Sequence, residues 1–351
     1  MPSAVILHPF DAIAGSQRVA VNIAQALETD GYSVDVILGF GSDGFVSRWV
    51  GVKRFLNVNN IMVRKILYPV WLFAVVPRIL RAVVTGEIVW ANTVHAAPAA
   101  FLAILFAPRR VVIHVHEVEF PRVFMYFLRF ASSLGATLLC VTDFQRRALS
   151  LDAQTLPNCV SVLAEATVAR NKHKLVFVGN TSAAKGFPMF IEVARSLTGS
   201  GLTPVAFLPS PDRSNQVLLA QAESAGIIVR YGVTDPYEMY EAGYLSLLCT
   251  DPDIWTETFS LVAVESMSCL VPVASAGTRV IKEILAQSLA FDVPSRDPEK
   301  IASEIRMLLS DPARYEFLVE ACRVRREEYT LELFQRRVRA LVTRLVERGL
   351  P

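Results

Sequence analysis

Two glutamates that lie eight positions apart, Glu257 and Glu265, are the residues of this sequence whose type and spacing point most directly to chemistry. Residues 250–257 are rich in Asp, Pro and Thr, which is typical of a loop. Apart from Glu265, residues 261–270 are apolar or small and predict a buried helix. The spacing therefore places one carboxylate on the loop before the helix and the other in its second turn.

The start of this helix is a predicted anion-binding site. Ser260 or Thr258 is placed to cap the helix. The N–H groups of its first turn and the positive end of its dipole favour an anion by about 0.3–1 kcal/mol for each such interaction. A phosphate there would have a carboxylate on either side. Since carboxylates repel phosphate, their targets would be hydroxyl groups, and sugar hydroxyls on both sides of a phosphate describe a nucleotide sugar.

A structural interpretation of the glutamates stays open, because two Glu at this spacing often occur by chance and a Glu near a helix start compensates the dipole. The residues that follow favour a functional role. Residues 271–277 predict a short strand that enters a loop of small residues, and a helical pattern resumes at 280–285. This order places the loop at the carboxyl end of a strand, where open α/β sheets bind ligands.

The segment 257–275 resembles the signature of the family 4 retaining glycosyltransferases, which have the GT-B fold. The Glu pair, the Phe-Ser between them, the Glu-Ser-Met at the second Glu and the Pro-Val-Ala of 272–274 all fall in register. In that family the first Glu contacts the transferred sugar, the second holds the ribose hydroxyls, and the amides between them bind the diphosphate. The resemblance implies a catalytic role for Glu257 and a donor-binding set of Glu257, Phe259, Ser260, Leu261 and Glu265.

Two strand–loop–helix–strand units of similar design occur in the chain. In the first, a strand at 4–8 is followed by a loop, a helix at 16–29 and a strand at 32–38. In the second, a strand at 174–179 leads through a polar loop into a helix at 186–197, which a strand at 203–208 follows. A length of 351 residues corresponds to about two domains. The chain is therefore predicted to have an α/β fold with two Rossmann-like domains.

The resemblance implies that the parallel sheets of the two domains face each other across a cleft, as in GT-B enzymes. The predicted domains are an acceptor-binding domain at 1–165 and a nucleotide-sugar-binding domain at 166–330, with the boundary in a stretch without strong periodicity. Residues 331–351 contain a predicted helix, which in this fold often crosses back to the first domain.

Two loops at predicted strand ends are candidates for the donor phosphates. Gly15-Ser16 would let the backbone approach a ligand or would begin an ordinary helix, and the resemblance favours the first, because family members carry a Gly-rich turn here. Lys185 lies near a helix start and can neutralise phosphate, so we assign it donor-binding and catalytic roles. The family usually has an Arg near the donor-site position of Asn180. With Asn at position 180, three outcomes are open. Donor binding is weaker, another part of the chain supplies the basic side chain, or activity is lost.

Three histidines belong to predicted strands or strand ends of the first domain. His114 lies inside a strand, and we expect it in the core. His95 and His116 come at strand ends, which point to the cleft in this architecture, and their spacing does not suit a metal motif. Family members have a cleft His near the donor sugar, and the resemblance implies a catalytic role for His95. His116-Glu117 resembles the His-Glu that ends this strand in many family members, which implies a donor contact for His116. A structural role is the alternative for His95 and for His116.

The resemblance also carries Val233 into the donor site, because the backbone of family members meets the nucleobase just after the strand that we predict at 227–231. Asp251-Pro-Asp253 has the form of the metal-binding Asp-x-Asp of a different transferase fold, but it does not follow the strand pattern of that fold. We therefore expect no metal and no cofactor, with the nucleotide-sugar donor as a co-substrate.

Two apolar segments with basic flanks lie in the first domain. Residues 66–76 would form a helix of about 16 Å, half of the roughly 30 Å hydrocarbon core, and so would not span a membrane. The flanks, with Tyr68 and Trp71, suit an interfacial segment, and a buried core helix is the equal alternative. Residues 120–130 repeat the pattern and add weight to a membrane surface as partner.

Composition narrows the class of protein. The net charge of +2 does not imply a nucleic acid partner. The mean hydropathy of +0.38 is high, which buried parallel sheets and a membrane-facing surface would explain. Five scattered cysteines without a Cys-x-x-Cys pair argue against disulfides and zinc and fit a reducing compartment. The first residues lack a signal-peptide pattern. We expect a cytoplasmic protein, peripheral on the cytoplasmic face of the membrane.

The predicted function is that of a retaining glycosyltransferase, which moves a sugar from a nucleotide sugar to an acceptor hydroxyl. The predicted acceptor is a glycan or lipid-linked intermediate of polysaccharide or lipopolysaccharide synthesis. The alternative is a catalytically weak or inactive GT-B subunit that binds a nucleotide sugar or supports a partner enzyme. Asn180 is the residue that favours this alternative.

Overall fold

The computed structural model describes the chain except for residues 13, 161–171, 212–214 and 349–351. The chain divides into two compact units. Unit 1 consists of Met1–Cys159 and Leu331–Pro351, and unit 2 consists of Val160–Thr330. The boundary that the sequence predicts, between 165 and 166, lies outside the described residues.

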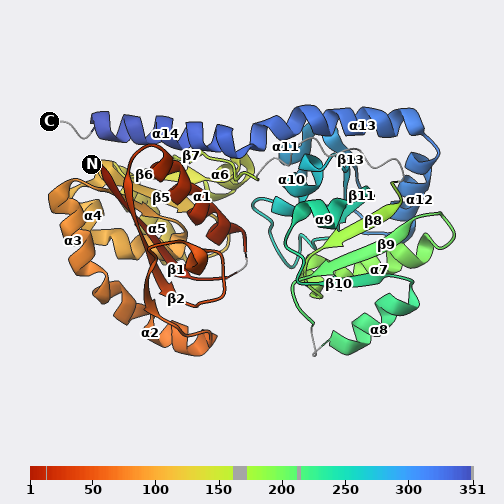
Figure 1. The fold of residues 1–351 in the computed structure, drawn as a ribbon, viewed down its shortest axis with the longest axis horizontal. Coiled ribbons are helices and arrows are strands. Elements are labelled where there is room, and N and C mark those ends of the chain that lie inside the picture. The colour runs from red at the N-terminus through yellow and green to blue at the C-terminus, as the bar shows by residue number, and fades with distance from the viewer. Residues whose placement is uncertain (13, 161–171, 212–214, 349–351) are drawn as a thin grey trace. The chain divides into compact units, whose positions relative to one another are not determined.

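Unit 1 is built on a seven-stranded parallel sheet with the order β3-β2-β1-β4-β5-β6-β7 (Figure 1). The central strands are continuous apolar runs, which is typical of parallel strands covered on both faces. The strands are β1 (Ser3–Phe10), β2 (Ser33–Phe40), β3 (Lys53–Leu56), β4 (Ile88–Ala91), β5 (Val111–Val115), β6 (Thr137–Cys140) and β7 (Gln154–Thr155).

Each face of the unit 1 sheet has its own hydrophobic core, because side chains alternate along a strand. Ala4 and Ile6 pack with α1 (Gly15–Thr29) and α14 (Leu331–Arg348), which lie side by side. Val5 and Leu7 belong to the core of the opposite face. The helices that contribute to that opposite core are α2 (Ile61–Ala74), α3 (Val76–Thr85), α4 (Phe101–Phe106), α5 (Arg122–Leu134) and α6 (Asp143–Leu149).

The apolar helical segment of unit 1 is longer than the sequence predicts. α2 and α3 cover 61–85 with only Val75 between them. Pro77 does not interrupt α3, because it lies in the first turn, where its missing N–H costs nothing. By length and composition alone, 61–85 would suffice to cross a membrane, a test that core helices of soluble proteins also pass. The interpretation as a buried core helix is wrong for α2, in which only Trp71 is fully buried.

Unit 2 repeats the architecture with a six-stranded parallel sheet, in the order β10-β9-β8-β11-β12-β13. The strands are β8 (Lys174–Val178), β9 (Thr203–Leu208), β10 (Ile228–Tyr231), β11 (Gly243–Leu248), β12 (Val273–Ser275) and β13 (Leu289–Asp292). The helices are α7 (Phe187–Ser196), α8 (Gln216–Ser224), α9 (Pro236–Tyr240), α10 (Leu261–Ser268), α11 (Ile281–Leu285), α12 (Pro298–Leu309) and α13 (Pro312–Arg325).

Both sheets have a point at which the strand order reverses, between β1 and β4 in unit 1 and between β8 and β11 in unit 2. Open α/β sheets bind ligands beyond the carboxyl ends of the strands at such a point. In unit 1 these ends lead to the start of α1 and to residues 92–95. In unit 2 they lead to the loops at 179–186 and 249–260, which hold Lys185 and Glu257.

The two unit 2 loops touch through their backbones at Gly186. Its φ is +75°, and an added Cβ would lie 1.9 Å from the carbonyl oxygen of Cys249. Nearby, the N–H of Asp251 donates to the carbonyl of Ala184 at 2.9 Å. Glycine is therefore required twice at position 186, for the left-handed backbone and for the close approach. The contact fixes Lys185 relative to the loop that carries Glu257.

We expect Gly186→Ala to destabilise the protein more than a control glycine replacement. Gly199 also has a positive φ, +79°, but has nothing within 4 Å of an added Cβ. Gly199→Ala should lower the free energy of unfolding by about 1–2 kcal/mol through backbone strain alone. Gly186→Ala should lower it by at least about 1 kcal/mol more, because the loops must separate. Urea unfolding followed by circular dichroism measures both, and equal losses would contradict the contact.

Candidate functional site

Lys185 and Glu257 meet at the point where the strand order of unit 2 reverses. The ammonium Nζ of Lys185 donates to Oε2 of Glu257 at 2.7 Å. The Glu257 side chain is 15% exposed and that of Lys185 is 34% exposed, so both remain reachable from solvent. Ser182 accepts the backbone N–H of Lys185 and orders the short turn before Gly186. The structure thus brings together two residues that are 72 positions apart in the chain.

The helix between the two glutamates begins as the sequence predicts. α10 starts at Leu261, and Ser260 is its cap, because the Ser260 hydroxyl accepts the N–H of Ala263 at 3.2 Å. The first N–H groups of any helix have no acceptor within the helix. The start of α10 therefore presents donors and a partial positive charge at the carboxyl edge of the sheet, next to the Glu257 loop.

Glu265 lies in α10 and is buried, with 7% of its surface exposed. Tyr240 is its neighbour in α9, and the Tyr240 hydroxyl donates to the carbonyl of Val262 at 3.0 Å. Burial, together with the charge of Glu265, raises the pKa of Tyr240 well above its usual value. Glu265 is thus held in the protein interior, with little of its surface open to a ligand.

The other predicted donor residues of unit 2 have different exposures. The Phe259 ring is buried against Tyr329 at 5.9 Å between ring centroids, so that only its backbone could meet a ligand. Leu261 is partly buried at the start of α10. Val233 follows β10 and is partly buried against a small cluster that includes Val176.

Asn180 is used locally. Its side-chain oxygen accepts the N–H and the hydroxyl of Ser182, which is the geometry of an Asx turn. Two arginines that sequence reasoning missed lie near the loops. Arg296 donates to the carbonyls of Cys249 and Thr250 at 2.8 and 3.2 Å. Arg279 and Glu257 line the same small cavity.

Asn92 is the centre of a buried polar cluster in unit 1. Its side-chain amide donates to the carbonyl of Ser16 at 2.7 Å, and its side-chain oxygen lies 3.2 Å from Nε2 of His116. Its backbone carbonyl lies 2.9 Å from Nδ1 of His8. These contacts join the ends of β1, β4 and β5 to the first turn of α1. The predicted pair Gly15-Ser16 and the predicted His116 therefore lie in one network.

The histidines of this cluster are neutral at physiological pH. Burial lowers the pKa of His8 from 6.5 to about 4 and that of His114 to about 3. Burial, together with its histidine neighbours, lowers the pKa of His116 well below its usual value. His114 is fully buried inside β5, its ring centroid 4.3 Å from that of His116. A neutral His116 that donates to Asn92 through Nε2 keeps Nδ1 as its acceptor nitrogen.

His95 lies apart from the contacts of the Asn92 cluster. Its carbonyl accepts the hydroxyl of Tyr68 at 2.6 Å, and its ring packs edge-on against Phe124 at 5.3 Å. It lines a cavity of about 470 Å³ together with residues of β1 and α2. Glu117 accepts the N–H groups of Val94 and His116, and burial raises the pKa of its carboxyl.

Sequence reasoning missed His8 and Asn92 because each is unremarkable in its own segment. They lie 84 positions apart and become partners only when β1 pairs with β4. The available signal was their shared place at the ends of apolar strands, the criterion that selected His95 and His116. Arg296 gave no such signal, since it follows β13 in a loop.

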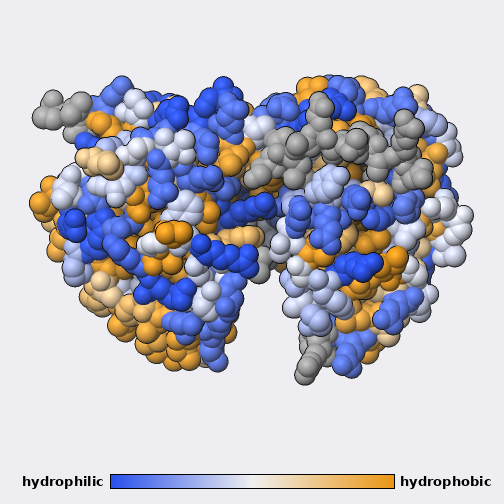
Figure 2. Space-filling model, viewed as in Figure 1, coloured by the Kyte–Doolittle hydropathy of each residue, from blue (hydrophilic) through white to orange (hydrophobic). Residues whose placement is uncertain are grey.

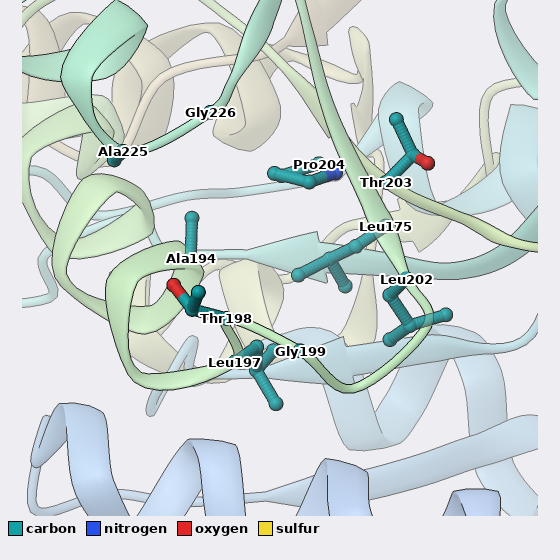
Figure 3. Close-up of a pocket in the computed structure, with 10 residues that line it drawn as sticks. All are labelled: Leu175, Ala194, Leu197, Thr198, Gly199, Leu202, Thr203, Pro204, Ala225 and Gly226. Carbon is teal, nitrogen blue, oxygen red and sulfur yellow. The ribbon is translucent and has the colours of Figure 1, made fainter.

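A further cavity, of about 240 Å³, lies at the opposite edge of the unit 2 sheet (Figure 3). Leu175 is near the start of β8 and Thr203 begins β9, so the cavity is at the amino ends of these strands. Its lining contains no charged side chain. It therefore lacks the groups that a diphosphate needs, and Lys185 and Glu257 mark the candidate site.

The buried histidines predict that the protein loses stability in mild acid. The unfolded chain binds protons to these residues below about pH 6.5, whereas the folded chain does not bind one at His8 until about pH 4. The free energy of unfolding should therefore fall as the pH drops from 6.5 towards 4, by about 1.4 kcal/mol per pH unit for each such His. Urea unfolding at pH 7.0 and 5.0 measures this loss.

His114→Leu is the variant that isolates one of these groups. It should reduce the loss of stability between pH 6.5 and 4.5 by about 1.4 kcal/mol per pH unit, because one buried proton acceptor is removed. The same pH dependence in wild type and His114→Leu would contradict a buried, neutral His114.

Two family models match the chain in succession. The model described as Glycosyltransferase Family 4 matches residues 13–162, and the model described as Glycosyl transferases group 1 matches residues 172–311. Together they cover most of the chain and correspond to one α/β unit each. No curated protein matches the chain.

Solved structures that resemble the chain cover nearly its whole length. Anabaena Alr3699/HepE in complex with UDP and glucose has a TM-score of 0.75 and 15% identity, with coverage of 98% of this chain and 100% of that one. Sucrose-phosphate synthase from Thermosynechococcus elongatus has a TM-score of 0.76 and 15% identity, covering 99% and 100%. WaaG, a glycosyltransferase involved in lipopolysaccharide biosynthesis, has a TM-score of 0.70 and 16% identity, covering 97% and 99%.

These likenesses confirm the predicted fold class, since both units have the parallel sheets of a GT-B protein. The two family models confirm the family resemblance that the glutamate motif indicated. With the family 4 model on its first half and the group 1 model on its second, the chain belongs to the GT-B glycosyltransferases that combine these two domains.

Proposed function

We propose that this glycosyltransferase uses a nucleotide-sugar donor and transfers the sugar with retention of configuration. The observation that carries the proposal is the Lys185–Glu257 contact of 2.7 Å beside the start of α10. It places a cation, a carboxylate and a set of N–H donors where unit 2 reverses its strand order. Complexes of the similar HepE structure with UDP and with UDP-glucose support a nucleotide-sugar donor for this chain.

Each side chain has a role that follows from its charge. Lys185 and the backbone N–H groups of 258–261 stabilise the departing diphosphate, because negative charge develops there in the transition state. Glu257 accepts hydrogen bonds from the hydroxyls of the transferred sugar. Glu265, which is 7% exposed, holds the ribose hydroxyls. Val233 meets the nucleobase through its backbone.

Unit 1 supplies the groups that meet the transferred sugar and its acceptor. The Asn92 cluster fixes the first turn of α1, where Gly15 and Ser16 are the proposed contacts for the donor phosphates. His116, neutral and oriented by Asn92, donates or accepts at a sugar hydroxyl. His95 lies on the 470 Å³ cavity and acts at the reacting centre.

The proposed reaction is a displacement on one face of the sugar. The bond between the anomeric carbon and the diphosphate oxygen breaks, and the acceptor oxygen bonds to the same face of that carbon. The acceptor proton passes to the departing diphosphate, so that no protein nucleophile is needed. Retention follows because both bonds lie on one face.

We propose that the acceptor is lipid-linked and that unit 1 meets the cytoplasmic face of a membrane. The helices α2, α3, α4 and α5 contain no Asp or Glu, and their basic residues are Arg64, Lys65, Arg78, Arg81, Arg122 and Arg129. Their exposed apolar side chains include Ile66 at 70% and Phe73 at 78%. Figure 2 shows hydrophobic residues gathered over α2. Each cation near an anionic leaflet contributes about 1 kcal/mol.

The same helices favour a peripheral association over a spanning one. Trp71, Ile79 and Ala82 are buried in the core of unit 1. Arg78 pairs with Asp35 at 2.8 Å and with Glu87 at 2.5 Å. A segment that crossed the bilayer would give up this packing and these ion pairs, whereas a segment lying on the surface keeps them.

A catalytically weak or inactive subunit is the second candidate, and one observation favours it. The Asn180 side chain closes its own loop, so position 180 supplies no charge to a phosphate. Arg279, which lines a small cavity with Glu257, is the nearby cation that would replace it. Donor turnover separates the two functions.

Lys185→Ala is expected to lower donor turnover by at least about a hundredfold, because one charge on the leaving group is worth about 2.7 kcal/mol or more in a water-poor site. Glu265→Ala should weaken donor affinity at least about tenfold. Release of nucleoside diphosphate from a panel of nucleotide sugars, with and without acceptor, measures turnover, and calorimetry measures donor affinity.

Lys300→Ala is the matched control, because Lys300 is an exposed lysine in α12 of the same unit. It should keep wild-type turnover. Saturable donor binding without nucleoside diphosphate release in wild type would establish the inactive subunit instead. Unchanged donor affinity in both site variants would remove the site.

The membrane proposal is tested by sedimentation with vesicles that contain anionic lipid. The double variant Ile66→Ser, Phe73→Ser should bind at least about tenfold more weakly than wild type, because two apolar side chains lose their burial. The double variant Val217→Ser, Val324→Ser changes exposed apolar residues of unit 2 and should bind like wild type. Binding that is equal in all three proteins would contradict a membrane-facing α2.

A further inference from the structure

A cavity of unit 1 lies between α2 and the carboxyl edge of the sheet. Its volume of about 470 Å³ lies within the usual 300–1,000 Å³ of small-molecule sites. Phe10 ends β1, and His95 follows β4, so the cavity lies at the edge where ligands bind. Its lining residues are Phe10, Ile61, Arg64, Lys65, Tyr68 and His95.

The lining combines apolar and aromatic side chains with two cations, and it contains no carboxylate. Arg64 is held in place, since it donates to the carbonyl of Val58 and to the side chain of Asn59, both at 2.7 Å. The side chain of Asn59 in turn donates to the carboxylate of Asp43. Asp43 is therefore linked to the Arg64 guanidinium through Asn59. In the described part of the chain, no carboxylate lies within ion-pair distance of Lys65. The cavity therefore has positive charge available for an anionic ligand.

Ile61 connects this cavity to the exposed apolar surface of α2. It lines the cavity, and it is 67% exposed at the start of the same helix as Ile66 and Phe73. If a ligand placed an anionic group between Arg64 and Lys65, its apolar chain would pass over Ile61. The chain would then stay in contact with apolar side chains of α2. At the other end, His95 shares the cavity lining.

We infer that this cavity binds the phosphate of a lipid-linked acceptor. The inference rests on the proposed function, and it adds the charge of the acceptor and the residues that recognise it. Lys65 and Arg64 bind the phosphate oxygens, while Phe10 and Tyr68 pack against the adjoining part of the ligand. The acceptor is thereby anchored on unit 1 by its phosphate, with the lipid directed towards the α2 surface.

Direct binding to the full chain tests the inference without a donor. The probes are octyl phosphate, octyl glucoside and inorganic phosphate, all below micelle concentrations, measured by calorimetry. Wild type should bind octyl phosphate at least about tenfold more tightly than either other probe, because only it offers both a charge and a chain. Lys65→Gln should lose about tenfold for octyl phosphate and little for octyl glucoside.

Arg54→Gln is the control variant, since it removes an exposed cation from β3 of the same unit that does not line the cavity. It should bind octyl phosphate like wild type, and the urea midpoints of both variants should match wild type. Equal affinity of wild type for octyl glucoside and octyl phosphate would overturn the inference, because the cavity would be merely apolar. Equal affinity for inorganic phosphate would also overturn it, because the site would be a simple anion site.

Failure of this inference is distinguishable from failure of the proposed function. If wild type turns over a nucleotide sugar but Lys65→Gln binds octyl phosphate unchanged, the transferase proposal stands and the cavity assignment falls. If no nucleotide sugar is turned over while the Lys65-dependent binding is present, the cavity assignment stands and the catalytic proposal falls.

Discussion

The close approach of two backbones in unit 2 is the constraint on which its candidate site depends. A side chain at position 186 would collide with the carbonyl of Cys249, so the loop after β8 can reach the loop after β11 only through glycine. The hydrogen bond from Asp251 to Ala184 and the bonds from Arg296 to Cys249 and Thr250 hold the same junction. The Lys185–Glu257 pair exists because this junction sets the spacing between its two loops.

In unit 1 a side chain, rather than a backbone contact, joins the segments at the carboxyl edge of the sheet. Asn92 follows β4 and reaches the first turn of α1, the end of β1 and the end of β5 at once. Because an amide offers both donors and an acceptor, one residue can satisfy a carbonyl and a neutral imidazole together. The histidines around it stay uncharged through burial, which avoids placing several positive charges in one small volume.

Much of the fold could be predicted from the sequence because the signals are local. The predicted strand at 203–208 matches β9, and the start of α10 at Leu261 follows from the Ser260 cap. The sequence does not predict α13, since only Leu318 and Cys322 of its fourteen residues are buried and its apolar pattern is weak. Asn92 could not be found in this way, because its role depends on strand pairing between distant segments. The Glu257–Lys185 contact likewise required the order in which the strands of unit 2 assemble.

The path of the chain through unit 2 has one more consequence. Val160 and Thr330 form an isolated parallel bridge, and the N–H of Val160 donates to the carbonyl of Tyr329 at 3.0 Å. The chain thus enters and leaves this unit at neighbouring points, and the remainder of the chain folds as one body with α14. Unit 2 is topologically an insertion whose two ends can be cut and rejoined at a single place, which is the arrangement that tolerates exchange of whole modules. Glu257 and Glu265 both lie between these two points, so exchange of unit 2 would replace them together.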